Sequence, residues 1–279
     1  MKSGEILFDG RNISAAGLKT NHERKSHERM MRGIRAKEIA MIFQDPMTFL
    51  NPVLRIDTQM TESIMLHQKV SRAEARAKAV ELMKLVSIPS PEHRLKQYPF
   101  EFSGGMRQRI IIAIALSCSP KLIIADEPTT ALDVTSQAQI LELLVELRKK
   151  IDMSIIMISH DLGVVAFSCS RVIIMYGGKI VEQGTNRDIF HHPKHPYTWG
   201  LLNSINDPED ERGKELIPIP GSPPDLLRPP EGCAFVDRCA KAMVVCKRVP
   251  PPTSHFGEKH SCSCWLYYQK GGEGATHDN

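Results

Sequence analysis

Residues 121–127 read KLIIADE, a short apolar run that ends in two adjacent carboxylates. In a parallel sheet, the residues at the carboxyl end of a strand lie at the edge where ligands bind. Carboxylate oxygens bind Mg²⁺, so Asp126 could hold the ion while Glu127 orients and polarises an attacking water. The same pattern also ends ordinary solvated strands, so its meaning depends on the neighbouring sequence.

Similar apolar runs flank this stretch at residues 38–43 and 154–159, and helical sequence separates each run from the next. Residues 71–86 begin with a capping-box pattern and continue with apolar residues at helical spacing. A second amphipathic pattern, with isoleucine and leucine on one face, follows at residues 133–147. Strands that alternate with helices predict a parallel α/β sheet.

The segment FSGGMRQR at residues 102–109 places a serine and two glycines directly before a predicted helix. Ser103, Gly104 and Gly105 would leave backbone N–H groups exposed at the positive end of the helix dipole, where anions bind. The glycines would let phosphate approach the backbone closely. Taken alone, the same residues also read as a turn that merely caps a helix.

The order and spacing of four motifs favour the functional interpretation. FSGGMRQR followed by LIIADEPTTALDV resembles the signature motif, Walker B motif and D-loop of ABC ATPases, while MIFQDP at 41–46 and ISHD at 158–161 resemble the Q-loop and the switch histidine. The resemblance implies an α/β fold of the P-loop NTPase type, an ABC nucleotide-binding domain with a helical subdomain at about residues 50–117. It also implies ATP and Mg²⁺ as ligands.

The resemblance also implies a role for each matching residue. Gln44 would bind Mg²⁺ together with Asp126, sense the attacking water and couple to membrane subunits, and His160 would contact the γ-phosphate beside the catalytic Glu127. Ser103, Gly104 and Gly105 would complete the ATP site of an opposite subunit, and Asp133 would lie across the dimer interface.

Three longer stretches narrow the family. The sequences IFQDPMTFLNP at 42–52, HHPKHPYTWGLL at 191–202 and IPGSPPDLLRPPEGCAFVDRC at 219–239 are similar to the ATPases of peptide importers, which include dipeptide, oligopeptide, nickel and glutathione importers. Such a subunit would pair with a second ABC ATPase subunit and with two transmembrane permease subunits, and would serve an extracytoplasmic substrate-binding protein indirectly. Those other subunits select the cargo, so this sequence does not distinguish among the cargoes.

Composition fits a peripheral protein on the cytoplasmic face of the cell membrane. No apolar run is long enough to span a bilayer, and the amino terminus lacks the apolar core of a secretory signal. A net charge of +4 does not indicate a nucleic-acid partner, and the basic stretch at 22–37 reads as a solvated loop.

A hairpin is predicted at residues 171–183, with its turn at a Gly-Gly pair, and beyond it the composition changes. Residues 208–252 are rich in proline and allow little helix or ladder strand. We therefore expect a nucleotide-binding domain at 1–205, a cysteine-rich peptide-importer region at 206–270 and a disordered tail at 271–279.

Five of the seven cysteines cluster near the end of the chain, and Cys233, Cys239, Cys246 and Cys264 are separated by five, six and seventeen residues. These intervals are wider than those of common zinc sites. Members of the peptide importer family carry a [4Fe–4S] cluster on a similar pattern, so the resemblance implies one here, with Cys262 as the competing ligand for the last position. Zinc and unliganded thiols remain the alternatives.

The pattern G-x-x-x-x-G-K-[ST], which cradles phosphate, is absent from these 279 residues. In the family that loop lies upstream of the segment resembling GEILFDG, here residues 4–10. Three explanations are open: a truncated or misannotated reading frame, a partner chain that supplies the front half, or a degenerate subunit that completes its partner's ATP site. We favour the first and do not expect hydrolysis by this chain alone.

Two further functions stay open. A soluble ABC ATPase that does not take part in transport would share the four motifs, although the peptide-importer-like residues after 190 weigh against it. A nonenzymatic iron–sulfur or zinc module would bind metal without dimerising in response to nucleotide. Co-purification with membrane subunits would separate the first of these from an importer subunit.

Overall fold

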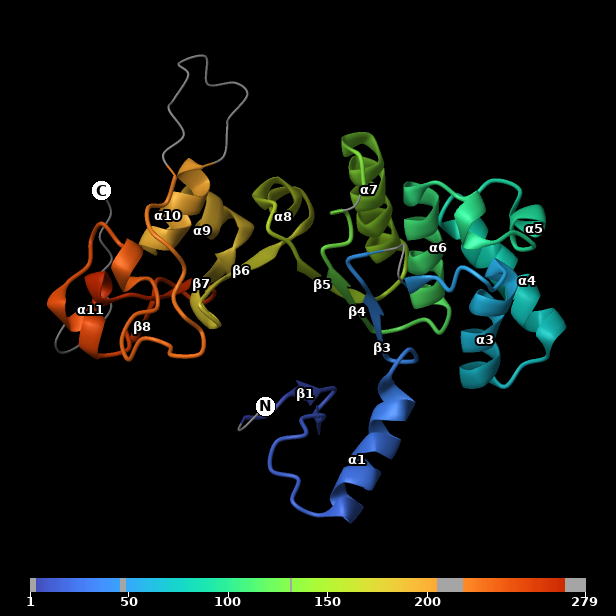
Figure 1. Cartoon of the computed structure of the whole chain (residues 1–279), viewed down its shortest axis with the longest axis horizontal. Coiled ribbons are helices and arrows are strands. Elements are labelled where there is room, and N and C mark those ends of the chain that lie inside the picture. Colours follow the sequence, from blue (N-terminus) through green and yellow to red (C-terminus); the bar gives the residue numbers. More distant parts are fainter. Residues whose placement is uncertain (1–3, 46–48, 131, 205–217, 269–279) are drawn as a thin grey trace. The chain divides into compact units, whose positions relative to one another are not determined.

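A computed structural model describes residues 4–45, 49–130, 132–204 and 218–268, and Figure 1 shows its elements in chain order. The chain divides into two compact units, Met1–His160 and Asp161–Asn279, which are described separately. The predicted domain boundary near residue 206 and the predicted tail at 271–279 lie outside the described residues. In the described part, no helix combines the length and apolarity that crossing a membrane requires.

A parallel three-stranded sheet forms the centre of the first unit. Its strands are β3 (Ile39–Ile42), β4 (Leu122–Asp126) and β5 (Ser154–Ile158), in the order β3-β4-β5. The three predicted apolar runs are therefore confirmed as strands of one sheet. Because the strands are parallel, their carboxyl ends meet at one edge, which is where the predicted site residues follow each strand.

Helices pack on this sheet and on one another. The predicted helix after Asp133 is α7 (Val134–Lys150), and α6 (Gly104–Leu116) follows the FSGG segment. Buried side chains of both helices share one core cluster with Ile42 of β3 and Ile123 of β4. Figure 1 shows α6 and α7 beside the strands of this unit.

The predicted helical subdomain contains α3 (Ile56–Gln68), α4 (Arg72–Leu85), the single turn α5 (Pro91–Arg94) and η1 (Pro99–Glu101) before α6. The capping box expected at the start of α4 is present, since Ser71 and Glu74 exchange side-chain and backbone hydrogen bonds. This cap satisfies N–H groups that the helix itself leaves unpaired.

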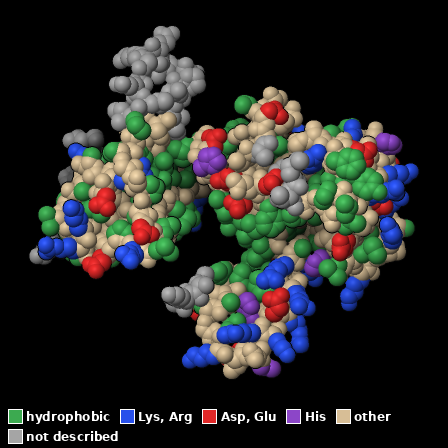
Figure 2. Space-filling view, viewed as in Figure 1, with side chains coloured by type: hydrophobic (Ala, Val, Ile, Leu, Met, Phe, Trp, Pro, Cys, Tyr) green, Lys and Arg blue, Asp and Glu red, His purple; other side chains and the backbone are tan. Residues whose placement is uncertain are grey.

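The basic stretch at 22–37 was predicted to be a solvated loop, and that prediction is wrong. The short hairpin of β1 (Leu7–Phe8) and β2 (Arg11–Asn12) is followed by a helix, α1 (Asn21–Ile34). A capping box between Thr20 and Glu23 starts this helix, and Ile34 is buried at its end. Figure 2 shows lysine and arginine side chains gathered over α1, so its charges are solvated although its backbone is helical.

The second unit is built on an antiparallel sheet in the order β6-β7-β9-β8. The predicted hairpin is confirmed as β6 (Arg171–Tyr176) and β7 (Lys179–Thr185), with both turn glycines at positive φ. The cysteine-rich segment adds β8 (Thr253–His255) and β9 (Ser261–Ser263), and β9 pairs with β7. The hairpin and the cysteine-rich segment therefore belong to one sheet.

In the described part of the proline-rich stretch no helix is longer than five residues, and short helices complete the second unit. They are α8 (Leu162–Ser168), α9 (Asn186–His191), α10 (Pro196–Asn203), η2 (Val236–Arg238), α11 (Val244–Arg248) and η3 (Trp265–Tyr267). One apolar cluster joins the inner face of the hairpin, including Val172, Ile174 and Tyr176, to Phe235 of the cysteine-rich segment.

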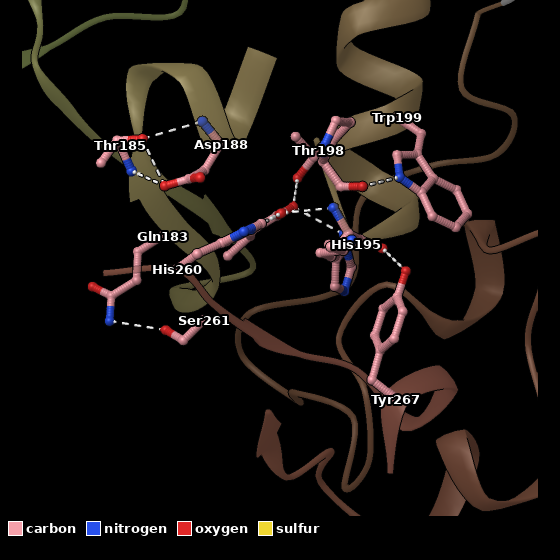
Figure 3. A network of polar contacts seen from close by, with 12 residues as sticks. Gln183, Thr185, Asp188, His195, Thr198, Trp199, His260, Ser261 and Tyr267 are labelled. Carbon is pink, nitrogen blue, oxygen red and sulfur yellow. Dashed lines mark hydrogen bonds and ion pairs between the residues drawn. The ribbon is translucent and has the colours of Figure 1, made fainter. Parts of the chain in front are cut away.

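A buried carboxylate fastens these elements together. Glu182 of β7 is 1% exposed, and its Oε1 accepts hydrogen bonds from the Lys194 backbone N–H (2.7 Å) and from His260 Nε2 (2.9 Å). Its Oε2 accepts from the His195 backbone N–H (2.9 Å) and from Thr198 Oγ1 (2.6 Å). In Figure 3, dashed lines from the labelled residues Thr198, His195 and His260 meet at one carboxylate, and the donor of His195 is its backbone N–H. One carboxylate thus connects β7, the start of α10 and the approach to β9.

Replacing Glu182 by Gln tests this fastening. The partners of the carboxylate are donors, so an amide NH2 group would face donors and leave buried groups unpaired. We expect Glu182→Gln to lower the free energy of unfolding by about 3 kcal/mol. Both tryptophans, Trp199 and Trp265, lie in the second unit, so their fluorescence in a urea titration reports its unfolding.

The matched control is Glu258→Gln, a change of the same chemistry at an exposed position. It should change the free energy of unfolding by less than about 0.5 kcal/mol. Equal effects of the two substitutions would contradict the fastening role of Glu182.

Candidate functional site

Glu127 directly follows β4, and its backbone has an unfavourable conformation that a specific contact stabilises. Its φ is +44°, a left-handed conformation that costs a non-glycine residue roughly 1–2 kcal/mol. Its backbone N–H donates to the carbonyl oxygen of Ile158, the last residue of β5, at 2.9 Å. This hydrogen bond fixes the backbone at Glu127. The Glu127 carboxylate then lies near the residues that follow the neighbouring strands.

Three side chains from separate strand ends and a loop converge on the Glu127 carboxylate. His160 Nδ1 lies 2.9 Å from Oε1, while Gln44 Nε2 donates to Oε2 at 2.6 Å and Thr130 Oγ1 donates to Oε2 at 3.0 Å. Gln44 follows β3 and His160 follows β5, so the parallel register of the sheet delivers both. The structure therefore brings together all three residues predicted to be catalytic.

These contacts favour the ionised form of Glu127. Hydrogen bonds from His160 and then from Thr130 hold the pKa of the carboxyl below its usual value, more than desolvation raises it. Because the folded pKa is depressed, the stability from these contacts is present above the unfolded pKa and is lost as the pH falls through the folded value. At neutral pH, Glu127 is a carboxylate that can accept a hydrogen bond from water.

Asp126 is the last residue of β4 and lies in register with Ile158 of β5. Asp126 therefore lies beside Glu127 at the carboxyl edge of the sheet. Gln44, which follows β3, lies at the same edge. A carboxylate and an amide oxygen are ligands that Mg²⁺ accepts, and Mg²⁺ is commonly bound by one or two carboxylates with phosphate completing the shell. The donor chemistry of Asp126 and Gln44 fits that ion.

The predicted signature residues start α6. Ser103 is the N-cap, and its Oγ accepts a hydrogen bond from the Met106 N–H at 3.4 Å. A Cβ atom on Gly105 would lie 3.1 Å from Ser136 Oγ, so this glycine lets α6 pack closely against the start of α7. Asp133 caps α7 by accepting from the Ser136 N–H at 2.9 Å, and that bond lowers the pKa of its carboxyl. The starts of α6 and α7 therefore adjoin.

Four cysteines of the second unit line one cavity. Its walls are Cys233, Cys239, Cys246 and Cys264, the four predicted ligands, together with His195, Pro196, Phe235, Val236, Lys241, Trp265 and Leu266. Cys262, the alternative ligand, is buried but does not line the cavity. Among the residues that the structure describes, no group of three or more His, Cys, Asp or Glu side chains is arranged so that it could hold a metal ion. Four thiols nevertheless face one space.

A close backbone contact explains how distant cysteines converge. The Cys233 N–H donates to the Cys246 carbonyl oxygen at 2.7 Å. A Cβ atom on the preceding Gly232 would lie 2.1 Å from that same oxygen, so only glycine fits there. Sequence analysis did not single out Gly232; the glycine directly before the first clustered cysteine was the available signal.

The thiols differ in acidity because their surroundings differ. Burial raises the pKa of Cys233 to about 11 and also raises that of Cys239. A hydrogen bond from the Cys262 thiol lowers the pKa of Cys264 to about 7 and correspondingly raises that of Cys262.

Comparison with known proteins identifies the family. A family described as the ABC transporter family matches residues 1–130, and one described as the oligopeptide/dipeptide transporter C-terminal region matches residues 181–246. The dipeptide transport ATP-binding protein DppD of Bacillus subtilis is 52% identical over 268 residues, which cover 96% of this chain and 76% of the relative. The chain belongs to the oligopeptide and dipeptide ABC transporter ATP-binding proteins. The oligopeptide transport ATP-binding protein OppD of Salmonella typhimurium is 54% identical over 89% of this chain and 71% of its own length.

Solved structures agree on the fold. The ATP-binding cassette MJ0796, solved as a dimer bound to ADP and Pi, has a TM-score of 0.53 at 26% identity and covers 66% of this chain and 74% of its own. The protein cbiO1 of Clostridium perfringens, part of the ABC transporter complex cbiONQ, has a TM-score of 0.55 at 28% identity, and the match covers 68% of this chain and 69% of that chain. The predicted ABC-type α/β fold is confirmed.

One residue at the site escaped the sequence analysis. Thr130 donates to Glu127 but lies in the segment PTT, which was read only as the link between the Walker B motif and the D-loop. A hydroxyl three residues after a carboxylate is too common a pattern to single out. Pro46, Met47, Thr48 and Ala131, which belong to the quoted Q-loop and D-loop stretches, lie outside the described residues.

Proposed function

We propose that this chain is the energy-coupling subunit of an importer for dipeptides or oligopeptides, and that Glu127 is the residue that activates water for ATP hydrolysis. The observation that carries the proposal is the convergence of Gln44, His160 and Thr130 on one ionised carboxylate. The names of the relatives, which are dipeptide and oligopeptide transport ATP-binding proteins, support the importer and its cargo class.

The residues of the site would act on a water in line with the γ-phosphate. Mg²⁺ and ATP supply the charge neutralisation and the transferable phosphoryl group. Glu127 orients and polarises the water, and its contacts with Gln44 and His160 hold the carboxylate in one direction. Asp126 and Gln44 are the residues that would hold Mg²⁺, and His160 would then contact the γ-phosphate.

Hydrolysis at this site needs a phosphate-binding loop from outside the 279 residues, which contain no such pattern. We propose that a polypeptide of these residues alone does not hydrolyse ATP. A second candidate is a subunit that only completes its partner's ATP site. The adjoining starts of α6 and α7 favour this second candidate. Ser103, Gly105 and Asp133 lie together there, and their arrangement does not depend on a nucleotide bound by this chain.

The proposed assembly contains a second ABC ATPase subunit and two transmembrane permease subunits on the cytoplasmic face of the membrane, with an extracytoplasmic substrate-binding protein acting through the permeases. Within the chain we propose a nucleotide-binding domain at 1–205 and a cysteine-rich region at 206–270. A soluble ABC ATPase outside transport would not account for the match of residues 181–246 to the peptide transporter C-terminal region.

We further propose that the cysteine cavity holds a [4Fe–4S] cluster. The support is the donor set, because four thiols line one space and iron–sulfur clusters are held by four cysteine thiolates. The cluster would stabilise a region that has few regular elements of its own.

The hydrolytic role of Glu127 can be tested in an assembly that contains a P-loop and hydrolyses ATP. We expect Glu127→Gln to reduce the rate by about 10²–10⁴-fold while Mg-ATP binding is retained, because the amide cannot act as a base but keeps the shape of the side chain. The control is Glu146→Gln on α7, where the carboxylate pairs with Lys150 at 3.3 Å on the surface. An unchanged rate for Glu127→Gln would contradict the proposal.

Metal content of anaerobically purified protein tests the cluster. Cys264→Ser should lower iron and acid-labile sulfide per chain to a small fraction of the unsubstituted level, because it removes a proposed ligand. Cys262→Ser should leave both close to that level, because Cys262 does not line the cavity. Zinc without sulfide would show a zinc site instead, and loss of iron in Cys262→Ser alone would show that the ligand assignment is wrong.

A further inference from the structure

A cleft with polar walls lies on the antiparallel sheet of the second unit. Its volume is about 440 Å³, within the range of about 300–1,000 Å³ that is typical of small-molecule sites. Every side chain that lines it is polar, and no residue lines both this cleft and the cysteine cavity. The lining residues include Arg171, Gln183, His255, Glu258, Lys259 and Ser261. A space of this size with such walls suits a small polar ligand.

The register of the sheet places three of these side chains in one row. Gln183 of β7 pairs with Ser261 of β9, and Ser261 pairs with His255 of β8. Directly paired residues of antiparallel strands direct their side chains to the same face of a sheet. Arg171 of β6 pairs with Thr185, two residues after Gln183, and therefore shares that face. The hairpin and the cysteine-rich segment thus form one polar surface.

Hydrogen bonds fix the middle of this surface. The Arg171 guanidinium donates to Gln183 Oε1 at 3.1 Å, and Gln183 Nε2 donates to Ser261 Oγ at 3.1 Å. Figure 3 shows the second of these bonds, which joins β7 to β9. The contact with Gln183 uses one NH2 group of the guanidinium, which has further N–H donors. Gln183 is therefore a positioning residue that orients the remaining donors of Arg171.

Positive charge predominates among the side chains that line the cleft. Arg171 and Lys259 are cations, and Glu258 is the acidic side chain of the lining. In the described part of the chain, neither cation forms an ion pair with a carboxylate. Arg171 lies on β6 and Lys259 precedes β9, with β7 between those strands, so their backbones are roughly 10 Å apart. Two unneutralised cations therefore border the cleft from two sides.

We propose that this cleft binds a small organic anion, whose carboxylate or phosphate group is held by Arg171 and whose far end lies near Lys259. A guanidinium matches the geometry of both oxyanions with parallel hydrogen bonds. The side chains between the two cations supply neutral hydrogen-bonding groups. This site is independent of the proposed ATP site and of the proposed cluster, because no residue of either one lines the cleft.

Calorimetric titration of the full chain tests the site with two matched pairs of probes. Each pair contains an anion and a neutral molecule of similar shape: succinate with succinamide, and glycerol phosphate with glycerol. We expect an anion to bind where its neutral counterpart does not, and the anion that binds identifies the site as one for carboxylate or for phosphate. Because the charges are exposed, added salt should weaken binding. Failure of both anions, or equal binding of the neutral molecules, would overturn the proposal.

Substitutions with opposite expected effects test the charges of the cleft. Arg171→Gln should weaken binding of the anion by about tenfold or more, because it removes charged hydrogen-bond donors. The matched control is Arg228→Gln, at an exposed arginine outside the cleft, which should leave binding unchanged.

Glu258→Gln should strengthen binding by about two- to five-fold, because it removes a negative charge from the lining. A gain in affinity cannot come from a damaged fold, so this variant keeps the test decisive. Unchanged binding in Arg171→Gln, or weaker binding in Glu258→Gln, would overturn the assignment of this cleft as an anion site.

Discussion

The parallel register of β3, β4 and β5 is the constraint on which the candidate ATP site depends. It places the residues after three strands at one edge, although Gln44 and His160 are separated by more than a hundred positions in the sequence. The hydrogen bond from the Glu127 N–H to Ile158 then turns one carboxylate toward both neighbours. Without that register, the Q-loop, the Walker B motif and the switch histidine would be separate segments with no shared chemistry.

The second unit uses a carboxylate differently. Glu127 is accessible and its partners keep it ionised and oriented for chemistry, whereas Glu182 is enclosed and its four donors hold a strand, a helix start and the approach to β9 in place. The cysteine cavity borders this network through His195. The physical cost of burying a charge is offset by the complete set of hydrogen bonds, as a buried carboxylate requires.

Much of the fold could be predicted because its signals are local. The run KLIIADE, the capping box at Ser71 and the turn at Gly177-Gly178 each determine a short element by composition alone, and the order of the motifs predicted the ABC-type fold. The helix α1 was missed because few of its residues are apolar, and its start depends on a capping box that was not recognised. β8 and β9 have three residues each, too few for a pattern of alternation.

The sequence predicted which residues belong to the candidate sites better than it predicted how those residues are arranged. Gln44, Glu127 and His160 were named from the motifs, but the contribution of Thr130 depends on the backbone turn at Glu127, which the sequence does not reveal. The four cysteines that line the cavity were also named, and Cys262, the alternative ligand, is buried without lining the cavity. The cap that His195 forms on α10 could not be predicted from sequence, because it depends on how the ring meets the Tyr197 N–H.

Equilibrium binding of Mg-ATP tests the central claim most directly, namely that Glu127 and its neighbours form the hydrolytic part of an ATP site that needs a phosphate-binding loop from elsewhere. The 279-residue chain would be compared with the same chain joined, ahead of residue 4, to the P-loop segment of a peptide-transport relative. The account predicts that only the joined chain binds Mg-ATP tightly and that Glu127→Gln leaves this binding intact. Comparable binding by the 279-residue chain alone would contradict it and would require a different phosphate site.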